Sequence, residues 1–527
     1  MSTQTLPHTQ TREVISYDPS TGEEIGRAAL MSASDVAAAV TIARSAQSAW
    51  ARLSYRERAR FILRAREIVL NQLEDIAKLV SRETGKPAAE AISMEIVPTL
   101  DLMRYFADNT KNLLDHRKID IGQYGLMGRS SYVVYKPLGV VGIISPWNFP
   151  WATPLDEVVM ALMAGNAVVL KPSELTPLTA LEIGEIFKQA QLPAGVLGIV
   201  TGDGTTGAAL VDAGVDKIMF TGSVNTGKRV AEAAAKHLTP VVLELGGKDP
   251  MIVLQDANLP NAARAAIWGA FCNSGQACAS IERCYVHASV AEEFLDLVVK
   301  QTQELKQDKA SVEAVDIGAM TNERQLRIVE DHVSDAIARG ARVLTGGKRI
   351  DDGNGWFHQP TVVIGVDHSM KVMSEETFGP VLPIMTFKTD EEAVRLANDS
   401  IYGLTASLFT RDIDRGRRLA EQIDAGTVMV NEVVYTHALA QTPWGGVKQS
   451  GYGRTHGLLG LLELVNAQHI HVNRVPGVPD VWWFPYTRKA GELFRGFARH
   501  FTTGSILGST LLLPKIVNRL RTIRKEK

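Results

Sequence analysis

The sequence has few cysteines, few aromatic residues and little net charge. Three cysteines (Cys272, Cys278 and Cys284) among 527 residues exclude a disulfide framework and favour a reducing compartment. The first residues, MSTQTLPHTQTREV, contain no apolar core of a secretory signal, so we expect a cytoplasmic protein. A formal net charge of −2 argues against nucleic acid as a partner, because proteins that bind it are usually basic.

The charge is distributed unevenly along the chain. Residues 474–527 contain eleven Lys and Arg against three Asp and Glu, a net of +8, which leaves a net of −10 for residues 1–473. The C-terminal tail is therefore a basic segment on an acidic body, and it needs an explanation of its own.

Hydrophobic periodicity predicts an α/β protein. Residues 34–115 place apolar side chains at the spacing of amphipathic helices. From Tyr132 onward, short apolar runs such as VGIIS, NAVVLK and KIMFTG alternate with helix-like stretches. This alternation indicates βαβ units and a parallel sheet, and its return near Lys248 predicts a second α/β domain.

Two segments offer groups for nucleophilic and acid–base chemistry. Cys278 in NSGQACAS has small or polar neighbours that leave room for a substrate carbonyl, although a lone cysteine is more often a buried hydrophobe. Glu244 in VVLELGGK lies between an apolar strand and two glycines, where lost hydration raises a carboxyl pKa towards that of a general base. A cap or surface glutamate is the alternative there. Cys272 and Cys284 lack such surroundings, and we expect them to be structural.

Three loops are candidates for binding. FTGSVNTGK places Gly222 and Gly227 on either side of a strand-to-helix turn, where backbone N–H groups can receive a pyrophosphate, although it is neither a GxGxxG nor a Walker A sequence. KPSE (171–174) lies at the carboxyl end of a strand, where ligands bind in open α/β sheets. PWNFP offers the Asn148 amide to an oxyanion, unless it is an ordinary loop residue. Because no CxxC or His-rich spacing occurs, we expect no metal site.

Taken together, these segments resemble the aldehyde dehydrogenase superfamily. SPWNFP, KPSE, FTGS, ELGGK, GQAC, EETFGP and PWGGVKQSG occur in that family's order, and the resemblance runs from about Tyr17 to about Val472. The 34-residue separation of Glu244 and Cys278 also resembles the family's spacing of base and nucleophile. The resemblance implies the hydrolytic, non-acylating type and a fold of three parts.

These parts are a Rossmann-type cofactor domain, an α/β catalytic domain and a small β extension used in forming a homodimer or homotetramer. We expect the NAD(P)-binding domain at 1–116 and 138–246, the catalytic domain at 247–447, the oligomerisation extension at 117–137 and 448–473, and the basic tail at 474–527.

The resemblance also implies a mechanism. Cys278 attacks the aldehyde carbon, and the Asn148 side chain with the Cys278 backbone N–H holds the oxyanion. Hydride then passes to the nicotinamide, and water activated by Glu244 hydrolyses the remaining thioester to the carboxylic acid. The positions that match the family's cofactor cleft are Trp147, Lys171, Glu174, Gly204, Gly222, Ser223, Glu376 and Phe378.

Glu174 would repel a 2′-phosphate, so we expect NAD, with NADP as the alternative. Two rival functions have features that would distinguish them. A CoA-acylating relative needs no hydrolytic base, whereas Glu244 is present. A non-catalytic binding protein would be expected to have lost Cys278, Glu244 or Asn148, and all three remain.

The tail indicates a lipid surface. Its longest uncharged stretch, 501–514, is shorter than the about 20 residues that span a bilayer. Its aromatic residues, mixed with arginines, favour a helix that lies on an anionic membrane at the cytoplasmic face, with packing across a subunit interface as the alternative. A membrane location makes long-chain aliphatic or apocarotenoid-like aldehydes plausible substrates, and a succinic semialdehyde-type substrate is the runner-up.

Overall fold

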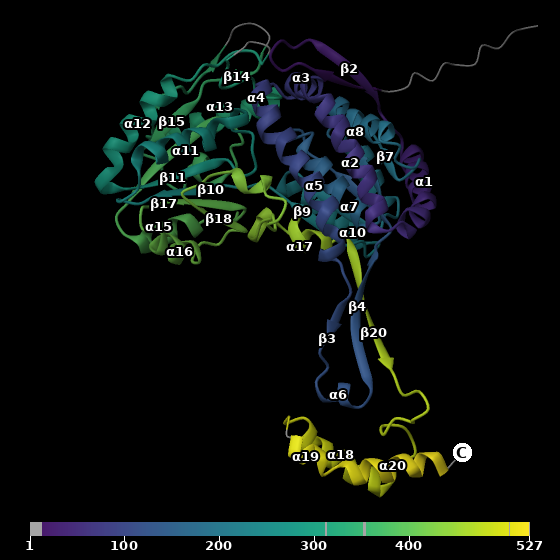
Figure 1. Ribbon diagram of the computed structural model, residues 1–527. Helices are drawn as coiled ribbons and strands as arrows, with labels where there is room; N and C mark the ends of the chain where they lie inside the picture. Colours follow the sequence, from purple (N-terminus) through teal and green to yellow (C-terminus); the bar gives the residue numbers. More distant parts are fainter. Residues whose placement is uncertain (1–12, 311–313, 351–354, 505, 526–527) are drawn as a thin grey trace, which may run out of the picture. The chain divides into compact units, whose positions relative to one another are not determined.

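The computed structural model describes residues 13–310, 314–350, 355–504 and 506–525 (Figure 1). By its internal contacts the chain divides into two compact units, each considered by itself below. The larger comprises residues 1–113 and 137–465, and the smaller comprises residues 114–136 and 466–527.

A six-stranded sheet forms one half of the larger unit. Its order is β19-β9-β8-β5-β6-β7, and all neighbours are parallel except β19 and β9. From β5 the chain continues outward through β6 and β7, and it then returns to β8 on the other side of β5. In open α/β sheets such a reversal marks the ligand crevice at the carboxyl ends of the strands. The strands are β5 (Val140–Ile144), β6 (Ala167–Lys171), β7 (Leu197–Ile199), β8 (Lys217–Thr221), β9 (Val241–Glu244) and β19 (Gly451–Tyr452).

Helices cover both faces of this sheet. One apolar cluster joins the sheet to α1 (Ala33–Arg52), α9 (Gly204–Asp212) and α10 (Val224–Ala235). α7 (Ala152–Ala164) contacts β5 and β6, and α8 (Pro177–Gln189) contacts β7. Strand residues alternate between the two faces, so an apolar run such as AVVLK is buried on both sides. Further helices packed in this half are α2 (Tyr55–Asn71), α3 (Leu73–Thr84), α4 (Ala88–Glu90), η1 (Ala91–Ile96), α5 (Val97–Leu113) and α17 (Gly457–Leu462).

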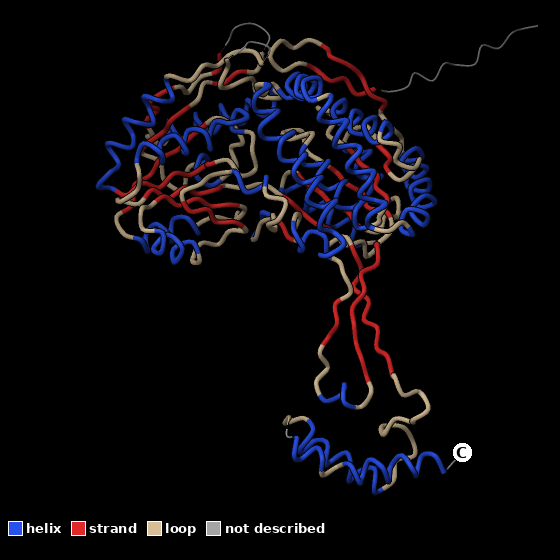
Figure 2. Tube along the Cα trace, viewed as in Figure 1, coloured by secondary structure: helices blue, strands red, loops and turns tan. Residues whose placement is uncertain are grey.

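A seven-stranded sheet forms the other half of the larger unit. Its order is β12-β15-β16-β11-β10-β17-β18, with only the β12 and β15 pair antiparallel. Figure 2 shows its strands in red among blue helices. The strands are β10 (Asp249–Val253), β11 (Ile281–His287), β12 (Arg342–Thr345), β15 (Thr361–Ile364), β16 (Val381–Phe387), β17 (Thr405–Phe409) and β18 (Thr427–Val430).

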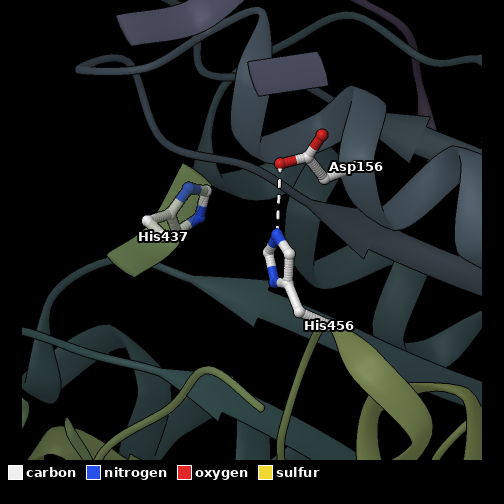
Figure 3. A group of neighbouring side chains, drawn as sticks. All are labelled: Asp156, His437 and His456. Carbon is white, nitrogen blue, oxygen red and sulfur yellow. Dashed lines mark ion pairs between the residues drawn. The ribbon is translucent and has the colours of Figure 1, made fainter. Parts of the chain in front are cut away.

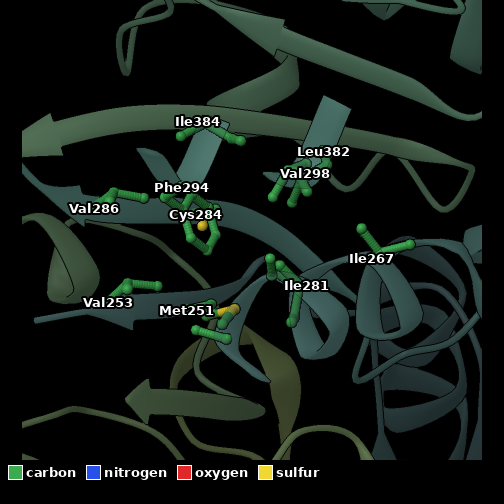
Figure 4. Packing of buried hydrophobic residues seen from close by; sticks show 14 of the residues in the cluster. Met251, Val253, Ile267, Ile281, Cys284, Val286, Phe294, Val298, Leu382 and Ile384 are labelled. Carbon is green, nitrogen blue, oxygen red and sulfur yellow. The ribbon is translucent and has the colours of Figure 1, made fainter. Parts of the chain in front are cut away.

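This second sheet also has an apolar cluster on each face. Met251, Cys284 and Phe294 belong to the cluster under α11 (Leu259–Phe271) and α12 (Ala291–Gln303) (Figure 4). The opposite cluster includes residues of α13 (Glu323–Ala338), α14 (Lys371–Ser374), α15 (Asp390–Asn398) and α16 (Ile413–Ala420). The α/β class with parallel-dominated sheets is confirmed. Two small hairpins complete the strands of this unit: β1 (Glu13–Tyr17) with β2 (Glu24–Ala29), and β13 (Arg349–Ile350) with β14 (Phe357–His358).

The smaller unit combines a sheet and a helical tail. β20 (Val465–Asn473), β4 (Arg129–Pro137) and β3 (Arg117–Ile119) form a three-stranded sheet, and α6 (Gln123–Leu126) precedes β4. The extension was expected at 117–137 and 448–473. The observed unit instead begins its second segment at residue 466, and β19 joins the six-stranded sheet. The tail folds into α18 (Arg488–Gly496), η6 (Phe497–Phe501), α19 (Ile506–Thr510) and α20 (Leu513–Lys525).

Candidate active site

Glu244 is the last residue of β9, and Leu245 separates it from Gly246 and Gly247. Its side chain is buried, and neither carboxylate oxygen has a hydrogen-bond partner among the described residues. Burial raises the pKa of Glu244 well above its ordinary value; the nearby Glu157 raises it further and Arg454 opposes the shift. This carboxyl group therefore holds a proton more tightly than a surface glutamate, as a general base working near neutral pH must.

Cys278 lies in the short loop that leads into β11, as its sequence context predicted. The thiol is half-buried, and burial raises its pKa, followed by the charges of Asp249, Glu244 and Glu376. Cys272 and Cys284 are fully buried, and Cys284 belongs to the core cluster under α11 and α12 (Figure 4). Of the three thiols, Cys278 is thus the one that a small molecule can approach.

Asn148 lies in the loop between β5 and α7. Its Nδ2 donates a hydrogen bond to the Gln276 carbonyl oxygen at 2.9 Å, two residues before Cys278. The Asn148 carbonyl oxygen accepts hydrogen bonds from Lys86 Nζ at 2.7 Å and from Asn273 Nδ2 at 3.0 Å. Contacts of both the side-chain amide and the backbone carbonyl therefore hold Asn148 beside the cysteine loop.

The structure brings the three predicted catalytic residues together. Gly247, three residues after Glu244, lies so close to the Cys278 carbonyl oxygen that a Cβ at residue 247 would overlap it. The charge of Glu244 acts on Cys278, and Asn148 binds the same loop. A thiol, an amide donor and a desolvated carboxyl group in one place can perform covalent acyl chemistry followed by hydrolysis.

Glu376 and Phe378 adjoin this place. Glu376 Oε1 accepts a hydrogen bond from the Gly247 N–H at 3.1 Å, and a Cβ at Gly246 would overlap its carboxylate. Burial raises the pKa of Glu376 to about 8. The Phe378 ring packs edge-on against Trp147, with 5.4 Å between ring centroids. Of the predicted cofactor residues, Glu376 therefore lies against the two glycines, and Phe378 lies against Trp147.

The remaining predicted cofactor residues lie at the carboxyl ends of parallel strands. Lys171 ends β6 and is buried, which lowers its pKa, and its Nζ lies 3.6 Å from the half-exposed Glu174. Gly204 begins α9, and Ser223 caps α10 by accepting a hydrogen bond from the Thr226 N–H. Two helix N-termini and a lysine–glutamate pair, all at carboxyl ends of strands in one sheet, suit the phosphates and the ribose of a dinucleotide, so the residues present fit that cofactor.

Buried charged residues that sequence patterns did not reveal support these loops. Lys86 and Glu95 form an ion pair of 2.5 Å between fully buried side chains, and Glu95 accepts the N–H groups of Trp151 and Ala152. Glu282 pairs with Lys248 at 2.6 Å and accepts the Thr377 and Phe378 N–H groups.

The cysteine loop has a similar support. Both carboxylate oxygens of Glu90 accept the Asn273 N–H at 3.0 Å, and burial raises the pKa of Glu90 to about 7. Asn273 itself has φ 51°, a left-handed conformation that asparagine tolerates better than most residues. No local sequence motif identifies the supporting residues Lys86, Glu90, Glu95 and Glu282. Lys248 is the exception, because it belongs to the ELGGK motif.

Comparison with known proteins identifies the family. A model of the aldehyde dehydrogenase family matches residues 6–470, so the chain belongs to this family and is an oxidoreductase that acts on aldehydes. The resemblance carried by the seven motifs is confirmed.

Curated and solved relatives agree with this assignment. The chain is 42% identical over 462 residues to a "4,4'-diapolycopene aldehyde oxidase" of Methylomonas sp, covering 87% of this chain and 85% of that one. It is 40% identical over 476 residues to a Mycobacterium bovis protein named "Putative succinate-semialdehyde dehydrogenase (NADP(+)) 2", covering 90% of each. The crystal structure of an NAD-dependent aldehyde dehydrogenase from Sinorhizobium meliloti superposes with a TM-score of 0.86 at 36% identity, covering 91% of this chain and 95% of that one.

Proposed function

We propose that this enzyme oxidises a hydrophobic aldehyde to its carboxylic acid with NAD, using Cys278 as nucleophile, Asn148 as oxyanion donor and Glu244 as base. The observation that carries the proposal is the convergence of these three side chains on the cysteine loop. NADP is the alternative oxidant, since the relatives include proteins named for either dinucleotide.

The chain's own residues account for each covalent step. Cys278 Sγ passes its proton to water and bonds to the aldehyde carbon, while the carbonyl oxygen takes the electron pair and accepts hydrogen bonds from the Asn148 amide and the Cys278 N–H. Lys171, Glu174 and Glu376 would hold a dinucleotide here, and its oxidised nicotinamide would supply the acceptor for the hydride that leaves this carbon. The carbonyl reforms as a thioester on Cys278.

Hydrolysis then needs a base. Glu244 takes a proton from water, the water oxygen bonds to the thioester carbon, and the bond from carbon to Sγ breaks. The acid leaves and Cys278 is restored. Burial raises the pKa of Glu244 above that of an ordinary glutamate, which strengthens it as a base for water.

The same residues define the test. The full chain with NAD and a long-chain aldehyde should yield one acid per NADH, and Cys278→Ala should abolish turnover. Cys284→Ala, in the core away from the reacting atoms, is the matched control and should retain activity. Acyl-CoA as the product in the presence of CoA, or turnover by Cys278→Ala, would overturn the proposed mechanism.

The surroundings of the nucleophile favour a hydrophobic aldehyde over an anionic one. The carboxyl groups of Asp249, Glu244 and Glu376 act on Cys278, and burial raises the pKa of each of them, so the site disfavours negative charge. A second carboxylate on the substrate, as in succinic semialdehyde, would be disfavoured there for the same reason. We expect kcat/KM for a long-chain or apocarotenoid-like aldehyde to exceed that for succinic semialdehyde by at least about tenfold, which is about 1.4 kcal/mol. A preference for succinic semialdehyde would refute this assignment while leaving the chemistry intact.

We also propose that the tail binds an anionic membrane surface. Its helices have a small apolar core of their own, made by Val481, Leu493, Phe497 and Leu512. Other large apolar side chains remain exposed: Trp483, Phe484, Tyr486, Leu507, Leu511, Leu513 and Val517. Exposed basic residues accompany them: Arg488, Lys489, Arg495, Arg499, Lys515 and Arg521. Apolar and basic groups together suit the headgroup region of an anionic bilayer.

No helix among the described residues is both long enough and apolar enough to cross a bilayer. Binding would therefore be peripheral. The full chain should sediment with vesicles that contain phosphatidylglycerol and much less with pure phosphatidylcholine vesicles. Leu507→Glu/Leu511→Glu should weaken binding, whereas Leu238→Glu, at an exposed leucine of the larger unit, should not. Unchanged binding by the double variant, or self-association through the tail in its place, would count against the membrane.

The three-stranded sheet of the smaller unit suits oligomerisation. β20 and β3 are its edge strands, and most residues of β20 are exposed. Edge strands offer unpaired backbone groups to another chain. We propose a homodimer or homotetramer assembled through this sheet. Sedimentation analysis should give two or four chains, and a monomer at micromolar concentration would refute the assembly.

A further inference from the structure

Three side chains outside the proposed catalytic set converge in the larger unit (Figure 3). Asp156 lies in the second turn of α7, His437 in the turn η4 (Tyr435–Ala438), and His456 directly before α17. One ligand atom from each lies within 4.8 Å of the others. Asp156 and His456 are almost completely buried, and His437 is half-buried.

Polar atoms of Asp156 and His456 lack hydrogen-bond partners at this place, among the described residues. His456 Nδ1 is bonded to Thr455 Oγ1 at 2.9 Å, which fixes the ring and turns Nε2 towards Asp156. Nε2 lies 3.4 Å from Asp156 Oδ2, longer than an ordinary hydrogen bond. Neither Nε2 nor Asp156 Oδ1 has a hydrogen-bond partner among the described residues. Buried polar atoms without partners are rare and call for a specific explanation.

Two imidazoles and one carboxyl group are donors that divalent transition metals take in proteins. His456 Nε2 and Asp156 Oδ1 are buried and have no hydrogen-bond partner among the described residues, so both atoms remain available to an ion. A divalent cation would also balance the charge of a buried carboxylate at Asp156.

We propose that Asp156, His437 and His456 bind a divalent transition-metal ion of the zinc or cobalt type. Ligands at roughly 2.0–2.1 Å in tetrahedral geometry lie roughly 3.4 Å apart, the separation that Asp156 and His456 already have. The hydroxyl on His456 Nδ1 is the kind of supporting partner that orients a metal-binding histidine. Zinc and cobalt accept such mixed nitrogen and oxygen ligands.

The position of the site indicates its role. The His437 ring packs edge-on against Trp444, with centroids 5.0 Å apart, and Trp444 packs with Cys278 and Ala279. The ion would join α7 to residues 437–456 and hold Trp444 against the catalytic loop. Asp156 lies about 280 residues before His437, and the two histidines are 19 residues apart, so no short motif contains the three ligands. The expectation of no metal site rested on such motifs alone.

Metal binding can be measured without the reaction. Untagged protein stripped with a chelator is titrated with Co²⁺, and visible absorption with calorimetry should show one site per chain that Zn²⁺ displaces. Asp156→Asn, His437→Gln and His456→Gln should each weaken binding by at least the about 10–100-fold that loss of a supporting partner costs. Zn²⁺ should raise the Tm of the stripped protein and not that of the variants.

A control excludes binding by chance at the surface. His237 and Asp212 form an exposed pair 3.7 Å apart, so His237→Gln should leave Co²⁺ binding unchanged. Less than half an equivalent of tightly bound Co²⁺ in the unmutated chain would overturn the proposal, and so would equal loss in His237→Gln. The Co²⁺ titration of the unmutated protein tests the proposal even if one of the variants fails to fold.

Discussion

Substitution of Glu244 by glutamine separates the two halves of the proposed reaction. The side chain is buried and neither oxygen has a partner among the described residues, so a neutral amide of the same size should fit without unfolding the chain. Cys278 and Asn148 are unchanged, and the thioester should still form. Only the step that needs a base for water is removed.

The expected magnitude follows from general base catalysis. Removing such a base typically costs about 10²–10⁴ in rate, or about 2.7–5.4 kcal/mol of transition-state stabilisation. Rapid mixing of Glu244→Gln with NAD and aldehyde should give a burst of about one NADH per chain, then turnover slowed by that factor. Denatured protein from the plateau should carry the acyl group on Cys278 by mass spectrometry.

Two results would refute this reasoning. Steady-state turnover within twofold of the unmutated enzyme would show that Glu244 does not activate water. A correctly folded Glu244→Gln that gives no NADH burst would show that Glu244 is needed before the thioester forms, as the base that deprotonates the Cys278 thiol. Cys278→Ala, which should give neither burst nor turnover, provides the baseline.

The remaining predictions concern neighbouring residues. Glu157→Gln removes a like charge that raises the pKa of Glu244, so the alkaline rise of kcat should move to lower pH, whereas Arg454→Gln should move it to higher pH; unchanged profiles would show that these charges do not reach the base. Asn148→Ala should lower kcat by about 10²–10³, and a loss below about tenfold would remove Asn148 from the oxyanion site. Glu174→Gln should raise the NADP-to-NAD ratio of kcat/KM by about tenfold, because one carboxylate no longer repels the 2′-phosphate; a constant ratio would place the ribose elsewhere. The pKa of Asp249 is raised to about 8 by burial, so the folded chain keeps a proton that the unfolded chain loses near pH 4. The free energy of unfolding should therefore fall between about pH 4 and 8, and urea titrations should show a shallower fall for Asp249→Asn.

Much of the fold and site could be predicted because the signals were local. Short apolar runs ending in glycine or proline mark strands whose carboxyl ends lie at one edge, and Lys171, Gly222 and Glu244 all follow from that pattern. A reactive cysteine among small residues is likewise visible in a few adjacent letters. The roles given to these residues stay predictions, because geometry alone does not show a reaction.

What could not be predicted depends on distant partners. Lys86, Glu95 and Glu282 look like ordinary surface charges in the sequence, and only tertiary packing buries them with their partners. The smaller unit begins its second segment later than the expected extension for a related reason. A two-residue strand, β19, pairs with β9 through backbone groups, and no side-chain pattern indicates such a pairing.

The Glu95 contacts have a consequence for exchanging parts between relatives. One carboxylate from η1 satisfies the first N–H groups of the segment that begins α7, and the Lys86 ammonium bound to it holds the carbonyl of Asn148. A chimera that imports residues 146–164 without residues 86–96 would separate the buried Glu95 carboxylate from its N–H donors and the buried Lys86 ammonium from its carbonyl acceptor. The two stretches therefore behave as a single unit of recombination, although they lie far apart along the chain.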